Sequence, residues 1–235
     1  MHQLTNADIK FVRSLNEKKF RDKHAMFVVE GEKMLEEALN SGYEMVSIWR
    51  RSEIGEQAMK RISQLSSPSP VLAILKQREQ SIDIEPDGLY LALDGVRDPG
   101  NLGTIIRTAD WFGVKGIFAS PDTVELYNPK VIQSTMGSIF RCKLSYEDIY
   151  SVCKKFADKD LPVYGTFLDG KNIYSESLEA KGLIVMGNES RGVSENVSKL
   201  LKHRLLIPKS PQSGAESLNV ASATAIVLSV FASRS

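Results

Sequence analysis

The second part of the chain alternates short apolar runs with stretches of helical pattern, and this alternation constrains the fold more than any other feature. The apolar runs are LYLALD, GIFAS, IFRCKL, PVYGTF, LIVMG and RLLIP. Stretches of helical period such as YEDIYSVCKKFADK separate them. Strands that alternate with helices form a mainly parallel sheet covered on both faces. The sequence therefore predicts an α/β domain whose ligand site lies at the carboxyl ends of the strands.

The first 80 residues predict a smaller α/β domain. Two apolar runs, AMFVVEG and EMVSIWR, read as strands on either side of a helix that ends near Gly42. A second helix is expected from Ser52 to about Gln64, followed by the strand VLAIL. The next stretch, KQREQSIDIEPDG, has no strong period and contains a proline, which is typical of a boundary. We therefore expect domains at residues 1–80 and 88–235, with a linker at residues 81–87.

The composition narrows the class of protein. With 235 residues, 42% of them hydrophobic, the chain can bury a core without a metal or a disulfide. Cys142 and Cys153 lack metal-ligand spacing and are expected as reduced, buried thiols. No stretch has the roughly 20 apolar residues of a membrane helix, and residues 1–14 lack an apolar signal core. We expect a cytoplasmic protein with no metal site and no membrane partner.

Charge is informative only locally, because 30 Lys and Arg balance 29 Asp and Glu. Between residues 10 and 24, six cations stand beside two acidic residues. These cations are Lys10, Arg13, Lys18, Lys19, Arg21 and Lys23. A solvated helix face explains such a run, and contact with RNA phosphates is the alternative. The choice between a solvated helix face and an RNA contact depends on evidence from other parts of the chain.

The stretch DGVRDPGNLGTIIRTADWFGV, residues 94–114, leads from an apolar strand into a helix. Its glycines do not follow the G-x-G-x-x-G spacing of a dinucleotide site. Asn101 is expected as the helix N-cap and Gly113 as the stop. Arg107 lies off the apolar stripe and one turn beyond Gly103, so a ligand could approach the surface beneath its guanidinium. The buried stripe is predicted to consist of Leu102, Ile105, Ile106 and Ala109.

Two later segments also run from an apolar strand into a polar turn. In IVMGNESRGVSEN, residues 184–196, Gly187 and Gly192 flank Glu189. Residues 205–231 pass from a strand through a proline-containing loop into a helix that begins close to Ser217 and Asn219. Three such strand ends in one parallel sheet predict a pocket.

At these three segments the chain resembles the SpoU (TrmH-like) branch of the SPOUT methyltransferases. The resemblance covers residues 88–233, and the first 80 residues resemble, less closely, the small substrate-binding domain that often precedes it. Two departures are the long polar segment KSPQSGAE and Ala221, which stands where a serine is frequent. The matching positions are Asn101, Gly103 and Arg107 for motif one, Gly187, Glu189 and Gly192 for motif two, and Ile207, Pro208, Gly214 and SLNV at residues 217–220 for motif three.

The resemblance implies a fold, a reaction and an assembly. Relatives transfer a methyl group from S-adenosylmethionine to a ribose 2'-hydroxyl of ribosomal or transfer RNA. Their C-terminal segment forms a trefoil knot, an exception to the general absence of knots, and the knotted loops hold the cofactor. Their active site lies at a homodimer interface, where an arginine of one subunit approaches the cofactor of the other. We expect the same here, with ribosomal RNA favoured over transfer RNA because of the N-terminal domain.

The resemblance also implies roles for individual residues. Arg107 is expected to be catalytic, because a fixed guanidinium can bind the RNA phosphate and the 2'-oxygen and stabilise developing negative charge. Arginine is almost always protonated, which favours this electrostatic role over that of a base. Asn101 is expected to orient Arg107 or the neighbouring loop, or to act only as an N-cap. Ser217 and Asn219 are expected to contact the substrate or Arg107, or only to cap the last helix.

The remaining motif residues are assigned to the cofactor or to the shape of the turns. Gly187, Ile207 and Leu218 are expected to contact S-adenosylmethionine, mostly through backbone groups. Glu189 orders the motif-two turn or pairs with a basic group across the dimer. Gly103 and Gly192 have structural roles. With RNA as the implied substrate, the basic stretch at residues 10–24 becomes a candidate contact surface for RNA.

Two other functions fit parts of the sequence. A non-enzymatic RNA-binding or ribosome-assembly factor would keep the fold without turnover, and it predicts no binding of S-adenosylmethionine. A dinucleotide-dependent oxidoreductase fits the alternation of strands and helices but lacks the glycine spacing and the acidic ribose contact. An RNA 2'-O-methyltransferase is the main hypothesis, because three motifs stand in order at strand ends.

Overall fold

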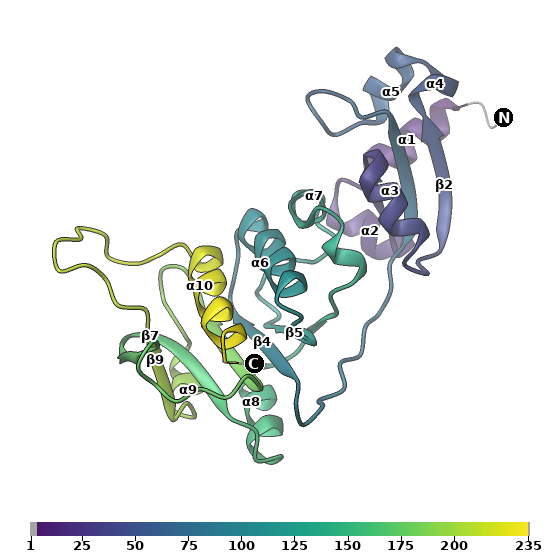
Figure 1. Ribbon diagram of the computed structural model, residues 1–235. Helices are drawn as coiled ribbons and strands as arrows, with labels where there is room; N and C mark the ends of the chain where they lie inside the picture. Colours follow the sequence, from purple (N-terminus) through teal and green to yellow (C-terminus); the bar gives the residue numbers. More distant parts are fainter. Residues whose placement is uncertain (1–3, 235) are drawn as a thin grey trace. The chain divides into compact units, whose positions relative to one another are not determined.

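The computed structural model describes residues 4–234, and the chain forms two compact units (Figure 1). The N-terminal unit comprises Met1–Glu79 together with Glu125–Arg141. The C-terminal unit comprises Gln80–Val124 together with Cys142–Ser235. Within residues 4–234, no helix is long and apolar enough to span a membrane.

The N-terminal unit is built on a three-stranded sheet with the order β1-β3-β2. Both outer strands run antiparallel to β3, which is buried except at its last residue. One core cluster joins Val28, Trp49 and Ile74 of the sheet to α1 and α5. The elements are α1 (Asn6–Ser14), α2 (Lys18–His24), β1 (Met26–Glu30), α3 (Glu32–Leu39), β2 (Met45–Arg50), α4 (Arg51–Ile54), α5 (Glu56–Ile62) and β3 (Val71–Lys76).

The helix expected from Ser52 to Gln64 is two short helices, α4 and α5. The interruption lies at Gly55, whose φ is +84°. A residue at this φ cannot continue a right-handed helix, and glycine adopts it without the steric cost of a Cβ. The three strands of this unit lie where the apolar runs predict them.

A segment from the middle of the chain completes the N-terminal unit. It carries α7 (Pro129–Thr135) and the 3-10 helix η1 (Ser138–Phe140), and α7 packs against β1. The Tyr127 ring stacks at 4.6 Å from the ring of Phe27, and its hydroxyl donates to the Arg78 carbonyl at 2.9 Å. The strand expected at IFRCKL is therefore wrong over most of its length, because this stretch turns through η1 before strand β6 begins.

The C-terminal unit contains a six-stranded sheet with the order β6-β5-β4-β8-β7-β9. All neighbouring strands are parallel, which agrees with the expected mainly parallel sheet. Helices α6 and α10 lie side by side, and α8 packs against β4, β5, β7 and β8 (Figure 1). The elements are β4 (Leu89–Asp94), α6 (Pro99–Trp111), β5 (Gly116–Ala119), β6 (Leu144–Tyr146), α8 (Ile149–Ala157), β7 (Val163–Asn172), β8 (Gly182–Gly187), α9 (Glu195–Ser198), β9 (His203–Leu206) and α10 (Val220–Ala232).

The stretch before β4 packs on the core of this unit. Ile82 and Ile84 contact a cluster that includes Tyr90 and Phe156. The Tyr90 hydroxyl donates to the Asp83 carbonyl at 2.9 Å and accepts from the Glu85 N–H at 2.8 Å. Residues 81–87 form no helix or strand, but these contacts hold them against the C-terminal unit.

Helix α6 begins three residues earlier than the sequence suggests. Its N-cap is Asp98, whose carboxylate accepts from the Asn101 N–H at 2.8 Å, so the expectation that Asn101 is the N-cap is wrong. Pro99 then occupies the first turn, where a missing N–H costs nothing. The helix ends at Trp111, and Gly113, the residue after the C-cap, has φ +68°. Two carbonyl groups at the end of the helix are satisfied here, because the Gly113 N–H donates to the Asp110 carbonyl and the Val114 N–H donates to the Ala109 carbonyl.

Candidate active site

The side chain of Asn101 joins all three sequence motifs. Its Nδ2 donates to Glu189 Oε1 at 3.0 Å, and its Oδ1 accepts from Asn219 Nδ2 at 2.8 Å. Asn101 lies in the first turn of α6, Glu189 in the turn after β8, and Asn219 at the start of α10. The polar chain Asn219–Asn101–Glu189 therefore ties three strand-end loops together. Asn101 does not bond to Arg107, which was one of its two expected targets.

Asn219 is both the N-cap of α10 and a link to Asn101. Its Oδ1 accepts from the Ala221 N–H at 3.0 Å and the Ser222 N–H at 3.2 Å. Its amide Nδ2 remains for Asn101. The cap is one of the two roles that the sequence leaves open for Asn219, whereas its amide contacts Asn101 and not Arg107, which was the other expected partner beside the substrate.

Replacement of Asn219 separates the two roles. Asn219→Ala removes the cap and is expected to cost about 1 kcal/mol, which lowers the thermal unfolding midpoint by about 2–4 °C. Asn219→Asp keeps an acceptor oxygen for the helix N–H groups and is expected to keep the wild-type midpoint. Calorimetric melting of both variants is the measurement. An equal loss of stability in both would show that the link to Asn101, not the cap, carries the effect.

The motif-two turn is closed on itself by backbone hydrogen bonds. Asn188 and Gly192 exchange both N–H···O bonds at 2.9 Å. A Cβ on Gly187 would lie 2.2 Å from the carbonyl carbon of Gly192, and Gly192 has φ +68°. Both motif glycines are thus required by the shape of the turn. Gly187 is crowded by the chain's own backbone, and this crowding is sufficient to explain why a glycine stands there.

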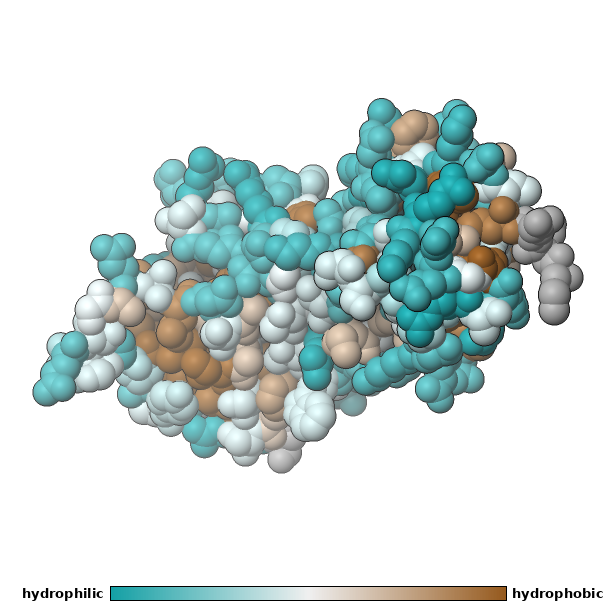
Figure 2. All heavy atoms as spheres, turned by 90° about the horizontal axis from the view of Figure 1, so that it is seen from above, coloured by the Kyte–Doolittle hydropathy of each residue, from teal (hydrophilic) through white to brown (hydrophobic). Residues whose placement is uncertain are grey.

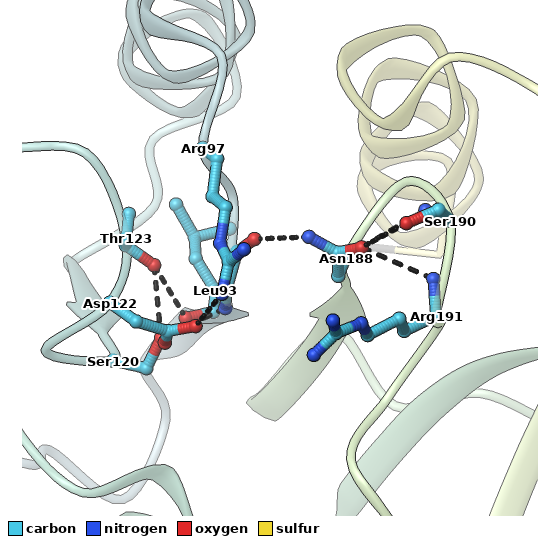
Figure 3. Close-up of polar contacts among 9 residues, drawn as sticks. Leu93, Arg97, Ser120, Asp122, Thr123, Asn188, Ser190 and Arg191 are labelled. Carbon is cyan, nitrogen blue, oxygen red and sulfur yellow. Dashed lines mark hydrogen bonds and ion pairs between the residues drawn. The ribbon is translucent and has the colours of Figure 1, made fainter.

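A second polar network lies at the carboxyl ends of β4 and β5 and was not expected from the sequence (Figure 3). The Ser120 hydroxyl accepts from the Gly95 N–H and donates to Asp122 Oδ1, at 2.8 and 2.7 Å. Asp122 also forms an ion pair with Arg97 at 3.0 Å. The Ser120 hydroxyl and then Arg97 hold the pKa of the Asp122 carboxyl below its usual value. These contacts therefore hold the loop between β4 and α6 in one position.

Arg107 is exposed on α6, on the side opposite the buried stripe. The stripe is as expected, since Leu102, Ile105, Ile106 and Ala109 are all buried. Among the residues that the structure describes, the Arg107 guanidinium has no hydrogen bond and no ion pair, so its donors are free for a ligand. Gly103 is buried, which differs from the open surface expected beneath the guanidinium.

The remaining predicted site residues lie in the loop between β9 and α10. Ile207 follows β9 directly and is half-buried, whereas Ser217 and Leu218 precede the N-cap and are exposed. Leu218 is a large apolar side chain with 48% of its surface exposed. The contacts within one chain bring together Asn101, Glu189 and Asn219, and they leave Arg107 and Ser217 outside this group.

The basic residues of the N-terminal unit divide into two kinds. Arg21 is only 2% exposed and donates to the carbonyls of Leu15 and Asn16, both at 2.7 Å. It also forms an ion pair with Glu125. The expectation that Arg21 contacts RNA is therefore wrong, because its guanidinium is buried and committed to protein groups. The other cations are exposed: Lys10, Arg13, Lys18, Lys19 and Lys23.

The two cysteines are placed as the sequence predicts. Cys142 and Cys153 are free and buried, as predicted, and burial raises the pKa of both thiols to about 12. Within residues 4–234, no group of three His, Cys, Asp or Glu side chains is placed to hold a metal ion.

Comparison with known families matches both parts of the chain. Residues 88–229 match the family model described as the SpoU rRNA Methylase family. Residues 6–54 match a model described as an MRM3-like substrate binding domain. The first match covers more than half of the chain and includes all three motifs.

Individual relatives resemble the whole chain. The 23S rRNA (guanosine(2553)-2'-O)-methyltransferase RlmP of Bacillus subtilis is 30% identical, with 95% of each chain covered. An AdoMet-bound rRNA methyltransferase from Sinorhizobium meliloti has a TM-score of 0.86 and 29% identity, over 98% of this chain and 96% of that one. A protein from Porphyromonas gingivalis that is assigned to the TrmH family has a TM-score of 0.89 and 36% identity, with both chains covered completely.

Proposed function

Because the chain belongs to the SpoU rRNA methylase family, we propose that it transfers the methyl group of S-adenosylmethionine to a ribose 2'-hydroxyl of ribosomal RNA. The RlmP relative is named for this reaction on 23S rRNA, and so is the RlmB enzyme of Pseudomonas putida at 31% identity over 69% of this chain. The observation that carries the proposal is the Asn219–Asn101–Glu189 chain, which joins the three motifs at one edge of the sheet.

The strand-end loops offer suitable groups for this cofactor. Half-buried Ile207 and exposed Leu218 supply apolar surface for an adenine ring, and the backbone around Gly187 supplies hydrogen-bonding groups. S-adenosylmethionine, when bound, supplies an activated methyl group. The protein supplies the alignment that in-line transfer needs. We assign Gly187, Ile207 and Leu218 to cofactor binding.

Arg107 is proposed as the catalytic residue. A ribose hydroxyl is a very poor acid, so the 2'-oxygen needs stabilisation as its O–H bond breaks and its bond to the methyl carbon forms. The unpaired Arg107 guanidinium can bind this oxygen and the adjacent phosphate at once, because its donors form a planar fork. Its fixed positive charge lowers the energy of the developing alkoxide. Arg107 stays protonated, and the proton passes to the phosphate or to water.

The first experiment measures activity directly. Purified protein is incubated with labelled S-adenosylmethionine and deproteinised ribosomal RNA, and transfer RNA serves as the competing substrate. We expect label on a ribose 2'-oxygen of ribosomal RNA. Mapping of 2'-O-methyl sites in total RNA from a deletion strain then identifies the nucleotide. Absence of label on every RNA would contradict the enzymatic function.

The rival function is a non-enzymatic RNA-binding or ribosome-assembly factor on the same fold. Titration calorimetry with S-adenosylmethionine separates the two, because the rival predicts no heat of binding. The relatives favour the enzyme, since RlmP and RlmB are both named as 2'-O-methyltransferases and the Sinorhizobium meliloti structure is bound to AdoMet.

We further propose that the chain forms a homodimer through α10 and the adjoining side of α6. Helix α10 contains no charged residue, although part of its surface is not covered by the unit itself. Ala225 and Ile226 are half-buried and lie between exposed Ser222 and Ser229. Figure 2 shows apolar residues gathered on the C-terminal unit. In such a dimer, Arg107 of one subunit approaches the cofactor loops of the other.

The dimer is tested by placing a charge on this face. Ile226→Glu is expected to convert a dimeric protein into a monomer, because a carboxylate buried between two apolar helices lacks a partner. Multi-angle light scattering gives the mass. Leu39→Glu, at a 61% exposed position of the N-terminal unit, is the control and should remain dimeric. A wild-type protein with the mass of one chain would contradict the proposal.

The remaining proposals concern substrate contact, the fold of the C-terminal segment and location. The N-terminal unit binds the RNA and the C-terminal unit carries out methyl transfer, in keeping with the match of residues 6–54 to a substrate binding domain. The segment that leads into α10 forms a trefoil knot, and the protein acts in the cytoplasm. The proposed phosphate contacts are Lys10, Arg13, Lys18, Lys19 and Lys23.

A further inference from the structure

The side chain of Asn188 makes four hydrogen bonds, all within the C-terminal unit. Its Oδ1 accepts from the Ser190 N–H, the Ser190 hydroxyl and the Arg191 N–H, at 3.0, 2.9 and 3.1 Å. Its Nδ2 donates to the Gly95 carbonyl at 2.6 Å (Figure 3). The acceptor atom thus orders the motif-two turn, and the donor atom ties that turn to a different loop.

The loop at the other end of this bond leads directly into α6. Gly95 follows β4 with φ +81°, and α6 begins after Asp98. The Gly95 peptide groups are held from both sides, because its N–H donates to Ser120 Oγ at 2.8 Å while its carbonyl accepts from Asn188. A Cβ on Gly95 would lie 3.3 Å from Asp122 Oδ2 and 3.7 Å from Asn188 Cβ. Little room is left for this loop to shift.

We propose that Asn188 is a positioning residue that fixes the motif-two turn relative to α6 and so sets the geometry between the cofactor loops and Arg107. Glu189 follows Asn188 directly and reaches Asn101 in the first turn of α6. In a two-fold dimer, the distance from Arg107 of one subunit to the motif-two turn of the other depends on how each turn sits on its own α6. This inference rests on the proposed methyltransferase function.

The motif Gly-x-Glu-x-x-Gly assigns no role to Asn188, which stands at its unspecified position between Gly187 and Glu189. A merely local role would be to shape the turn through Oδ1. The Nδ2 bond to Gly95 joins residues 93 positions apart and does not contribute to the shape of the turn. A substitution that loses this bond and keeps the Oδ1 acceptor therefore distinguishes positioning from local structure.

Asn188→Asp is that substitution. Aspartate keeps an acceptor oxygen for Ser190 and Arg191, but its second oxygen cannot donate to the Gly95 carbonyl and faces that carbonyl as another acceptor. Asn188→Ala removes both kinds of bond. Asn196→Asp, at an exposed position of α9, makes the same chemical change away from the network and is the matched control.

The measurements are the Kd for S-adenosylmethionine by calorimetry, kcat on ribosomal RNA and the thermal midpoint. For Asn188→Asp we expect a nearly unchanged Kd and midpoint and a kcat lowered about tenfold, the effect of one lost hydrogen bond that acts on alignment. For Asn188→Ala we expect a weaker Kd as well, because the turn loses its order. Asn196→Asp should match the wild type in all three.

A wild-type kcat in Asn188→Asp would overturn the inference and leave the proposed function intact. Equal losses of Kd and kcat in the Asp and Ala variants, with a lowered midpoint, would also overturn it, because they would indicate a purely structural role. A wild-type protein that neither binds S-adenosylmethionine nor methylates RNA would instead overturn the proposed function itself.

Discussion

Replacement of Arg107 by alanine is expected to lower kcat for RNA methylation by about 10²–10³-fold, the usual loss when one charge-stabilising donor is removed from an active site. The affinity for S-adenosylmethionine should stay unchanged, because the guanidinium acts on the RNA oxygens. Arg107 is exposed and its neighbours on α6 pack independently of it, so the fold should tolerate the change. Label transfer from S-adenosylmethionine to ribosomal RNA gives kcat, and calorimetry gives the Kd.

Two further variants sharpen the Arg107 experiment. Arg107→Lys keeps the charge but loses the planar fork, and we expect it to recover only part of the activity. Lys159→Ala removes an exposed cation after α8 and should behave as wild type. Full activity of Arg107→Ala would remove this residue from the mechanism. A parallel loss of cofactor binding would indicate that Arg107 serves the cofactor site instead of the substrate.

Replacement of Arg21 by alanine is expected to destabilise the N-terminal unit by about 3–5 kcal/mol, the cost of breaking a buried ion pair. Arg21 is almost fully buried, and its loss would leave Glu125 without its partner and the carbonyls of Leu15 and Asn16 without their donor. Hydrogen exchange of the β1 and β3 amides measures the effect within this unit. Arg13→Ala, an exposed arginine of the same stretch, is the control and should change little.

The Arg21 experiment has a second step. The double variant Arg21→Met, Glu125→Met replaces both charges by apolar side chains of similar length and is expected to regain much of the lost stability. Failure to regain it would show that the hydrogen bonds to the two carbonyls matter more than the pair. A stable Arg21→Ala variant would contradict the structural role and return Arg21 to the candidate RNA contacts.

The elements with a strong period were predictable from the sequence. The apolar stripe of α6 and the strands β4 and β8 depend on local spacing, and they lie where that spacing puts them. The wrong predictions of helix bounds occur where a single residue determines the end of a helix. Gly55 divides a predicted helix because of its positive φ, and Asp98 takes the N-cap role from Asn101. The sequence Asp98-Pro99 is itself a start signal, because a capping acid followed by proline is typical of a helix N-terminus.

The candidate site was predictable as a set of residues but not as a set of contacts. The motifs brought Asn101, Glu189 and Asn219 to notice, yet no local pattern could tell that one amide would bond to both others. The bonds of Asn188 and Ser120 to Gly95 were missed for the same reason, since they depend on the register of β4, β5 and β8. Burial of Arg21 was missed because a basic run shows charge and not packing.

The segment at residues 125–141 has a consequence for how this protein can be divided. It lies between β5 and β6 along the chain, yet its apolar residues Val131 and Ile132 are buried in the N-terminal unit. A fragment that starts at residue 80 would carry this segment with its apolar side chains exposed to water. A fragment that ends at residue 79 would lack these side chains from its core. We expect neither fragment to be soluble alone. Transfer of the N-terminal unit to another protein would therefore require both of its chain segments, residues 1–79 and 125–141.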